Sequence, residues 1–216
     1  YIIFSSLFQL YVFVAIMGVS FTLSSIFGEF YKSYKKQKNS SNFLHSIVKM
    51  FLSNRHKNGG YIVHIGIVLL FIGFIGRAFE VEKEFSLSPG EQIYFSNYVF
   101  KLNSIKSEAR DNHYAFLSEI DVVDSSTNQL LTNLKPEKRI YFYWNSDPEK
   151  RQPHSELDIY STIQKDIYSI FSGYDAQKNI GYFKIMINPL VNWVWIGGVL
   201  MVIGSLFAFW PSRRNS

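Results

Sequence analysis

The chain has 216 residues, of which 47% are apolar and 18% aromatic, and its formal charge is +5. It has no cysteine, which excludes a disulfide framework, a thiolate metal site and a cysteine nucleophile. The apolar residues lie in three long blocks with the charges between them, so the net basic charge alone does not indicate a nucleic-acid partner.

The first apolar block, residues 1–28, contains no charged residue. As a helix it is long enough to cross a hydrocarbon core of roughly 30 Å. The chain starts at Tyr1 rather than Met, and neither the basic start nor the cleavage site of a signal peptide is visible. We therefore expect an upstream part of the protein to precede this span.

Residues 29–58 are predicted to form a basic loop. Within it, apolar side chains recur at helical spacing from Phe43 to Phe51, with Ser41 or Asn42 as the N-cap. This pattern indicates a short amphipathic helix. It would lie either in the headgroup region or as a surface helix packed on other spans.

Two further spans are predicted, at residues 59–78 and 188–210. In the later one we expect Asn188 to be the N-cap and Pro189 to occupy the first turn. Trp193 and Trp195 at one end and Trp210 at the other are typical of the aromatic belts at two membrane interfaces.

The orientation follows from the lysine and arginine residues. They are concentrated in residues 29–58 and recur at Arg213 and Arg214 in the tail, residues 211–216. Both segments are therefore predicted to be cytoplasmic by the positive-inside rule, and residues 79–187 to lie on the outer side. The net positive charge is then a topology signal, and a nucleic-acid partner is excluded.

The outer region, residues 79–187, has the alternating pattern of strands separated by turns such as Ser88-Pro89-Gly90. A helix is predicted from Ser161 to Phe171. Glu80, Glu82 and Glu84 alternate along a strand and are expected to form a solvated face. The predicted fold class is an α-helical membrane protein with three transmembrane helices and an inserted small antiparallel β domain, a barrel or a sandwich, on the outer face.

One histidine lies within the second span. His64 follows the start of that span by about one and a half turns, in an uncharged apolar run. An ionisable group within hydrocarbon is costly and indicates a functional site, and neutral imidazole is a good ligand for haem iron. Gly60, one turn earlier on the same face, would leave room for a flat macrocycle. The alternative that His64 only hydrogen-bonds across helices stays open, while Gly66, Gly73 and Gly76 suit helix packing on roughly the opposite side.

The other histidines carry weaker signals. His45 and His56 lie in the basic loop and are expected to be solvated, and His113 opens a predicted strand and is expected to be structural. His154 lies in an outer loop, where it could meet a cofactor. No Ser/His/Asp arrangement or glycine-rich phosphate loop can be assembled, so no catalytic residue is assigned.

Four stretches, in one order, carry a family resemblance. They are the GGxxxHxG run within Asn58–Gly66; Pro136-Glu137-Lys138-Arg139 with Tyr141; Ser155-Glu156 with Ile159 and Asp166-Ile167-Tyr168; and Asn188-Pro189-Leu190-Val191 with Trp193, Trp195 and Gly197-Gly198. Together they resemble the bacterial cytochrome c-type biogenesis protein family CcmF, the large haem-lyase subunit. The resemblance extends from about Asn58 to Pro211.

The resemblance implies the C-terminal portion of a haem lyase, which joins haem to the CxxCH thiols of apocytochrome c outside the membrane. The resemblance also implies that His64 is one of two axial ligands to the iron of a b-type haem. A haem is the substrate as well. The family's tryptophan-rich segment, outer histidine ligands and second transmembrane histidine lie upstream of the matching part. This fragment alone is therefore expected to be inactive.

The resemblance also implies partners and a location. The partners are the membrane, a periplasmic haem chaperone, apocytochrome c, other cytochrome c maturation subunits and quinol. The location is a bacterial inner membrane with residues 79–187 in the periplasm, or the membrane of an organelle that kept the pathway. Whether the chain is naturally separate or a fragment stays open.

Two other functions stay open. The chain could be a non-enzymatic membrane scaffold whose outer β domain binds partner proteins, with His64 only an interhelical hydrogen bond. It could also be the haem-handling subunit of the other cytochrome c assembly pathway, although the ordered motifs disfavour this.

Overall fold

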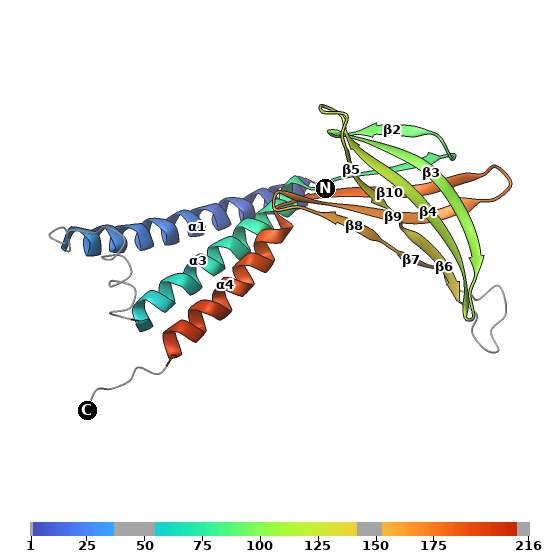
Figure 1. Cartoon of the computed structure of the whole chain (residues 1–216). Coiled ribbons are helices and arrows are strands. Elements are labelled where there is room, and N and C mark those ends of the chain that lie inside the picture. The colour runs from blue at the N-terminus through green and yellow to red at the C-terminus, as the bar shows by residue number, and fades with distance from the viewer. Residues whose placement is uncertain (1, 37–54, 142–152, 211–216) are drawn as a thin grey trace. The chain divides into compact units, whose positions relative to one another are not determined.

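The computed structural model describes residues 2–36, 55–141 and 153–210. The chain divides into two compact units, a helical one from Tyr1–Phe79 with Pro189–Ser216 and a second one from Glu80–Asn188 (Figure 1). The amphipathic helix predicted between Phe43 and Phe51 lies outside the described residues.

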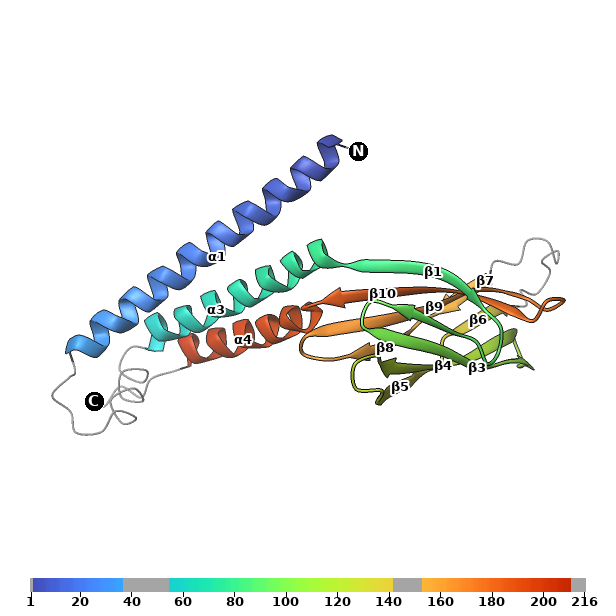
Figure 2. The same cartoon turned by 90° about the horizontal axis from the view of Figure 1, so that it is seen from above.

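The helical unit holds three long helices (Figure 2). They are α1 (Ile2–Lys36), α3 (Arg55–Gly76), which is followed by the short 3₁₀ turn η1 (Arg77–Phe79), and α4 (Val191–Phe209). Among the residues that the structure describes, three segments are long and apolar enough to cross a bilayer: Leu10–Glu29, Arg55–Phe79 and Val191–Phe209. Their 20, 25 and 19 residues match the roughly 20 residues that a transmembrane helix needs. The predicted three apolar helices are confirmed, and α1 continues beyond the predicted span to Lys36.

Glycines bring α3 and α4 into close contact. A Cβ atom at Gly66 would lie 2.7 Å from the Gly197 carbonyl oxygen, and one at Gly197 would lie 2.5 Å from the Gly66 oxygen. Farther along the two helices, a Cβ at Gly59 would lie 2.7 Å from the Gly204 oxygen. Any larger side chain at these positions would push the helices apart. The predicted use of this face of the second span for helix packing is therefore confirmed.

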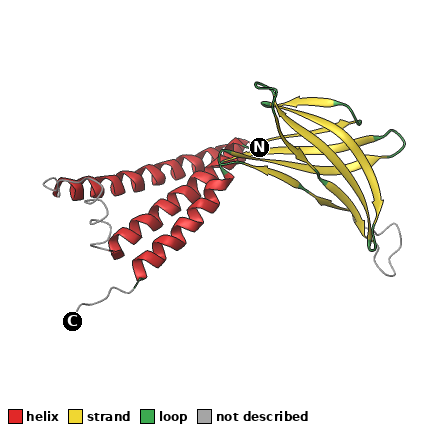
Figure 3. Ribbon diagram, in the orientation of Figure 1, coloured by secondary structure: helices red, strands yellow, loops and turns green. Residues whose placement is uncertain are grey.

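The second unit is an antiparallel β-sandwich (Figure 3). Its four-stranded sheet has the order β1-β10-β9-β8, and its six-stranded sheet has the order β2-β3-β4-β6-β7 with β5 paired to β4. The strands are β1 (Val81–Leu87), β2 (Gln92–Phe95), β3 (Tyr98–Ala109), β4 (His113–Asp124), β5 (Leu130–Leu134), β6 (Glu137–Tyr141), β7 (Pro153–Glu156), β8 (Asp158–Ser161), β9 (Lys165–Asp175) and β10 (Ile180–Pro189). Of the predicted barrel or sandwich, the sandwich is the one found.

Large apolar side chains from both sheets form the core of the sandwich. Phe100 and Ile120 on the six-stranded sheet and Phe171 and Phe183 on the four-stranded sheet are almost fully buried. The rings of Phe171 and Phe183 stack with their centroids 4.8 Å apart. Each such side chain contributes on the order of 2 kcal/mol through burial, so this layer holds the two sheets together.

Two predictions about local structure were wrong. The segment predicted as a helix from Ser161 to Phe171 forms the end of β8 and most of β9. Residues Asn188 and Pro189 end β10 instead of starting a helix. The chain turns at Leu190, whose φ is 64°, and α4 begins at Val191. Proline fits the end of a strand because its missing N–H interrupts the ladder there.

The predicted turns are present. At Ser88-Pro89-Gly90 the chain reverses with Gly90 at φ 93°, a conformation that favours glycine. At the end of β4, Asp124 Oδ1 accepts hydrogen bonds from the Ser126 and Thr127 amides at 2.9 and 3.0 Å. The Ser126 hydroxyl bond and these two amide bonds lower the pKa of Asp124 to about 2.

Candidate functional site

His64 lies on α3 with its side chain exposed, in the middle of an apolar helix. Its Nδ1 lies 2.7 Å from the carbonyl oxygen of Gly60. A carbonyl oxygen can only accept, so Nδ1 carries the proton and Nε2 of the neutral ring has a free lone pair. A hydrogen bond of this kind fixes the orientation and tautomer of metal-ligating histidines.

The space beside His64 is open on the Gly60 side. A Cβ atom built at Gly60 would meet nothing within 4 Å, whereas one at the adjacent Gly59 would lie 2.6 Å from the Ala208 Cβ. The two neighbouring glycines therefore have different roles. Gly59 allows contact with α4, and Gly60 leaves room on the face that carries His64.

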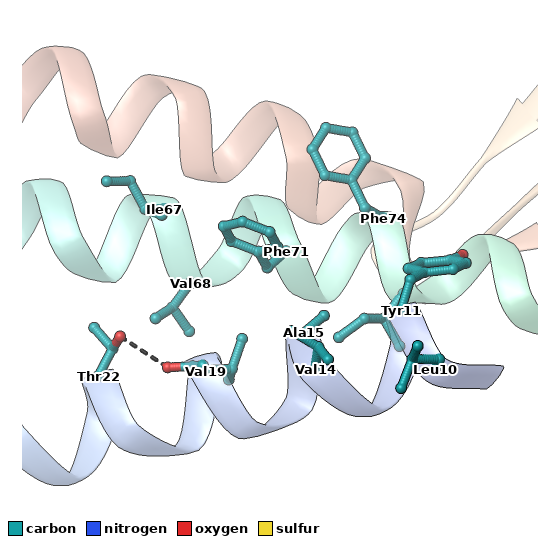
Figure 4. Close-up of a pocket in the computed structure, with 12 residues that line it drawn as sticks. Leu10, Tyr11, Val14, Ala15, Val19, Thr22, Ile67, Val68, Phe71 and Phe74 are labelled. Carbon is teal, nitrogen blue, oxygen red and sulfur yellow. Dashed lines mark hydrogen bonds between the residues drawn. The ribbon is translucent and has the colours of Figure 1, made fainter. Parts of the chain in front are cut away.

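An apolar groove of about 810 Å³ lies between α1 and α3 (Figure 4). On α3 its lining residues follow His64 at helical spacing, so they share one side of that helix with the imidazole. Most of its walls are aliphatic or aromatic, among them Val14, Val19, Val68 and Phe71. Thr22, one of its few polar lining residues, donates its hydroxyl to the Gly18 carbonyl at 2.8 Å. The groove therefore presents hydrocarbon to any ligand.

A polar cluster joins α1 and α3 at the opposite end of this face. Glu29 Oε2 of α1 lies 2.7 Å from Lys57 Nζ and accepts a 3.4 Å hydrogen bond from the Tyr61 hydroxyl, both on α3. Lys32 Nζ lies 3.5 Å from the other Glu29 oxygen. The side chains of Glu29 and Lys57 remain 39% and 49% exposed, so the pair is accessible rather than enclosed.

The structure brings two other histidines together around one tyrosine. The ring of His113 on β4 packs at a tilt against Tyr141 on β6, with the centroids 4.9 Å apart, and the exposed His154 on β7 meets the same ring edge-on at 5.6 Å. His113 Nδ1 bonds Asn112 at 2.6 Å, while its buried Nε2 has no partner in the part of the chain that the structure describes. Hydrogen bonds to the Tyr141 side chain and to the Glu137 carboxylate hold the pKa of Arg139 above its usual value.

Sequence reasoning missed this aromatic cluster, because the three rings come from three different strands and meet only when these strands pair. The remaining histidines do not extend either site. His56 is exposed and its ring lies edge-on to Phe209 at 6.4 Å, whereas His45 lies outside the described residues. In the described ranges, no group of three or more histidine, aspartate or glutamate side chains could hold a metal ion.

Two of the motif segments pair with each other in the six-stranded sheet. Arg139 on β6 bonds Glu156 on β7 at 3.1 Å and Glu137 on its own strand at 2.9 Å. Lys138 donates to the Ser155 hydroxyl at 2.8 Å, and partial burial lowers the pKa of this lysine. These residues therefore tie β6 to β7, which is a structural role.

Fold and site together define a membrane protein with apolar helices, an inserted β-sandwich and a histidine exposed on one of its spans. A family model described as "CcmF C-terminal beta-sandwich" matches residues 78–189, slightly more than half of the chain. The chain therefore belongs to the CcmF family, and the resemblance found in its motifs is confirmed.

Curated relatives agree with this assignment. The chain is 26% identical over 156 residues to the cytochrome c-type biogenesis protein CcmF of Haemophilus influenzae, covering 72% of this chain and 23% of that protein. It is 28% identical over 153 residues to the cytochrome c-type biogenesis protein ccl1 of Rhodobacter capsulatus, covering 70% and 22%. It is 25% identical over 155 residues to the probable cytochrome c-type biogenesis protein NrfE of Escherichia coli, covering 71% and 26%. The chain thus spans about a quarter of the length of these relatives.

A solved structure has the same fold. The chain named "Cytochrome c Heme Lyase CcmF" superposes with a TM-score of 0.65 at 17% sequence identity, over 91% of this chain and 30% of that one. This likeness covers both the helical unit and the β-sandwich, and it bears out the predicted fold class.

Proposed function

We propose that the chain is the C-terminal part of a cytochrome c haem lyase, with His64 as an axial ligand of a b-type haem held within its spans. The observation that carries the proposal is the His64 geometry. Its Nδ1 is bonded to the Gly60 carbonyl and its Nε2 is left with a lone pair on an open apolar face. Membership of the CcmF family and the names of the relatives support the same function.

The residues of this chain fit a haem. The imidazole supplies a nitrogen ligand, the Gly60 carbonyl fixes its tautomer, and the groove between α1 and α3 is lined mostly by apolar side chains. A bound haem b would supply one-electron transfer at this position. The second axial ligand would come from outside the described helices, since α1 and α4 contain no histidine.

The competing interpretation of His64 as an interhelical hydrogen bond has less support. The His64 side chain hydrogen-bonds to the carbonyl oxygen of Gly60, which lies on α3 itself. Among the described residues no bond from His64 to α1 or α4 is found. An ionisable side chain within a span indicates a functional position by default.

The reaction that we propose for the whole enzyme is the addition of a CxxCH thiol across a haem vinyl group. The sulfur forms a bond to one vinyl carbon, and the S–H hydrogen goes to the other, so no net oxidation occurs. We propose that the β-sandwich faces the periplasm, beside a haem chaperone, apocytochrome c and the other maturation subunits. Electrons would reach the b haem from quinol. We assign no residue of this chain to the addition step.

A chimera tests the proposed function. In a bacterium that lacks its own CcmF, the matching C-terminal part of Haemophilus influenzae CcmF is replaced by this chain, and haem covalently bound to cytochrome c is measured by peroxidase staining. We expect attachment with the wild-type chain, loss with His64→Ala, and retention with His56→Ala as the matched control. Equal attachment by the His64 and His56 variants would overturn the role given to His64.

A further inference from the structure

The face of α3 that carries His64 changes character along its length. Lys57 and Tyr61 precede His64 by seven and three residues, which places all three on one side of the helix. Past His64 the same side continues as Val68 and Phe71, which line the apolar groove. One end of this face is therefore charged and rich in hydrogen-bond donors, and the other end is hydrocarbon.

The polar end lies within reach of a ligand held at His64. With a rise of 1.5 Å per residue, Tyr61 lies about 4.5 Å and Lys57 about 10 Å from His64 along the helix axis. The lysine chain is long and flexible enough to cover part of that distance. Glu29 of α1 holds the Lys57 ammonium at 2.7 Å and thus fixes where its charge lies.

The charge at this end is positive. Lys57 and Lys32 surround the single carboxylate of Glu29, and Arg55 and Lys35 add two further bases on the same ends of α3 and α1. A haem has two carboxylate groups on one edge and apolar groups on the others. Carboxylates placed in the apolar groove would lose their hydration without gaining a partner, which is costly. The polar end of this face, at Lys57, would instead offer such carboxylates a cationic partner.

We propose that Lys57, with the Tyr61 hydroxyl, binds the propionate carboxylates of the haem that His64 ligates, and so fixes the direction of the haem in the membrane. This inference rests on the proposed ligation by His64. Glu29 acts as a positioning residue, since it contacts Lys57 and Tyr61 and carries the same charge sign as the propionates.

The test compares two probes that differ only in the carboxylates. The full chain in nanodiscs of neutral phosphatidylcholine is titrated with haemin and with haemin dimethyl ester, and binding is followed by the Soret band. We expect the wild-type chain to bind haemin about tenfold more tightly than the ester. A difference of this size corresponds to one charge-assisted contact that is partly exposed to solvent. Lys57→Met is expected to bind the two probes equally.

Matched variants separate this site from general charge attraction. Lys32→Met removes the same charge from the same end but leaves the closer Glu29–Lys57 pair intact, so it is expected to keep the preference for haemin. The double variant Glu29→Gln with Lys57→Met avoids an unpaired carboxylate and is expected to behave like Lys57→Met. A preference for haemin that survives in both Lys57 variants would overturn the proposal.

The variant His64→Ala distinguishes a failure of this inference from a failure of the proposed function. If His64→Ala binds haemin as well as the wild-type chain does, ligation by His64 is wrong and the propionate contact is wrong with it. If binding depends on His64 but not on Lys57, ligation stands and the propionate contact alone is contradicted. The Glu29–Lys57 pair would then serve only to join α1 to α3.

Discussion

At the scale of single residues, the adjacent glycines Gly59 and Gly60 have different roles: one allows helix packing and the other leaves room for a ligand. Gly59 lies against α4, with the Ala208 Cβ 2.6 Å from where its own Cβ would be, while Gly60 opens onto empty space. The Gly60 carbonyl also accepts the His64 Nδ1–H. The free volume beside the imidazole is therefore a property of Gly60, and the stability of the α3–α4 contact depends on Gly59.

We expect Gly60→Leu to lower haem binding at least tenfold without lowering thermal stability. The added side chain meets no protein atom, but it fills the space beside His64. Binding is measured by haemin titration and stability by thermal unfolding of the chain in detergent. Gly198→Leu is the matched control, because Gly198 of α4 also faces open space. Equal haem affinity in the two variants would contradict the role of Gly60.

The turn after β4 has a stability contribution that depends on pH. Hydrogen bonds from Ser126 and Thr127 depress the pKa of Asp124 to about 2, from an ordinary value of 3.8. The stabilisation is then fully present above about pH 4 and is lost as the pH falls through about 2. We expect the stability difference between the wild-type chain and Asp124→Ala to shrink over this interval in denaturant unfolding. A difference that stays constant from pH 6 to pH 2 would contradict the assignment.

The sequence was sufficient to single out His64, because one ionisable residue in an apolar span stands out; its role as a haem ligand stays a prediction. The sequence was not sufficient to predict the Glu29–Lys57–Tyr61 cluster, because Glu29 and Lys57 lie on different helices, 28 residues apart. The rings of His113, Tyr141 and His154 likewise meet only after β4, β6 and β7 have paired. Contacts of this kind depend on tertiary structure and leave no local pattern.

At the scale of elements, β9 shows why a strand was predicted as a helix. Ile163, Ile167 and Phe171 recur every four residues, which is helical spacing. In the structure Ile167, Ser169 and Phe171 of β9 are buried at every second position, and Asp166 is buried beside them. The buried serine masked the alternation, and pairing with β8 and β10 decided the outcome.

We expect Phe171→Ala to destabilise the β-sandwich by about 3–5 kcal/mol, because it removes a fully buried ring that stacks on Phe183. Tyr182→Ala on the neighbouring strand β10 is the control, since that side chain is 45% exposed. Unfolding of the chain in urea, followed by near-ultraviolet circular dichroism, gives both values. Equal midpoints for the two variants would contradict the assigned core.

At the scale of the whole molecule, the proposed function requires that the chain cross the membrane in one particular direction. The bases near the ends of α1 and α3 predict that residues 29–58 are cytoplasmic and that the β-sandwich is outside. Reporter fusions at residues 40 and 130 are expected to give a cytoplasmic and a periplasmic signal, respectively. A cytoplasmic signal at residue 130 would overturn the proposed orientation.

Ligation of a haem by His64 underlies the proposed function, and chemical rescue provides a direct test of it. The visible spectrum of the reduced chimera is recorded for the wild-type chain, for His64→Gly, and for His64→Gly with added imidazole. We predict a low-spin b-type spectrum in the wild type, its loss in the variant, and its return with imidazole, because the free base replaces the missing ligand. A low-spin spectrum that persists unchanged in His64→Gly without imidazole would contradict the claim.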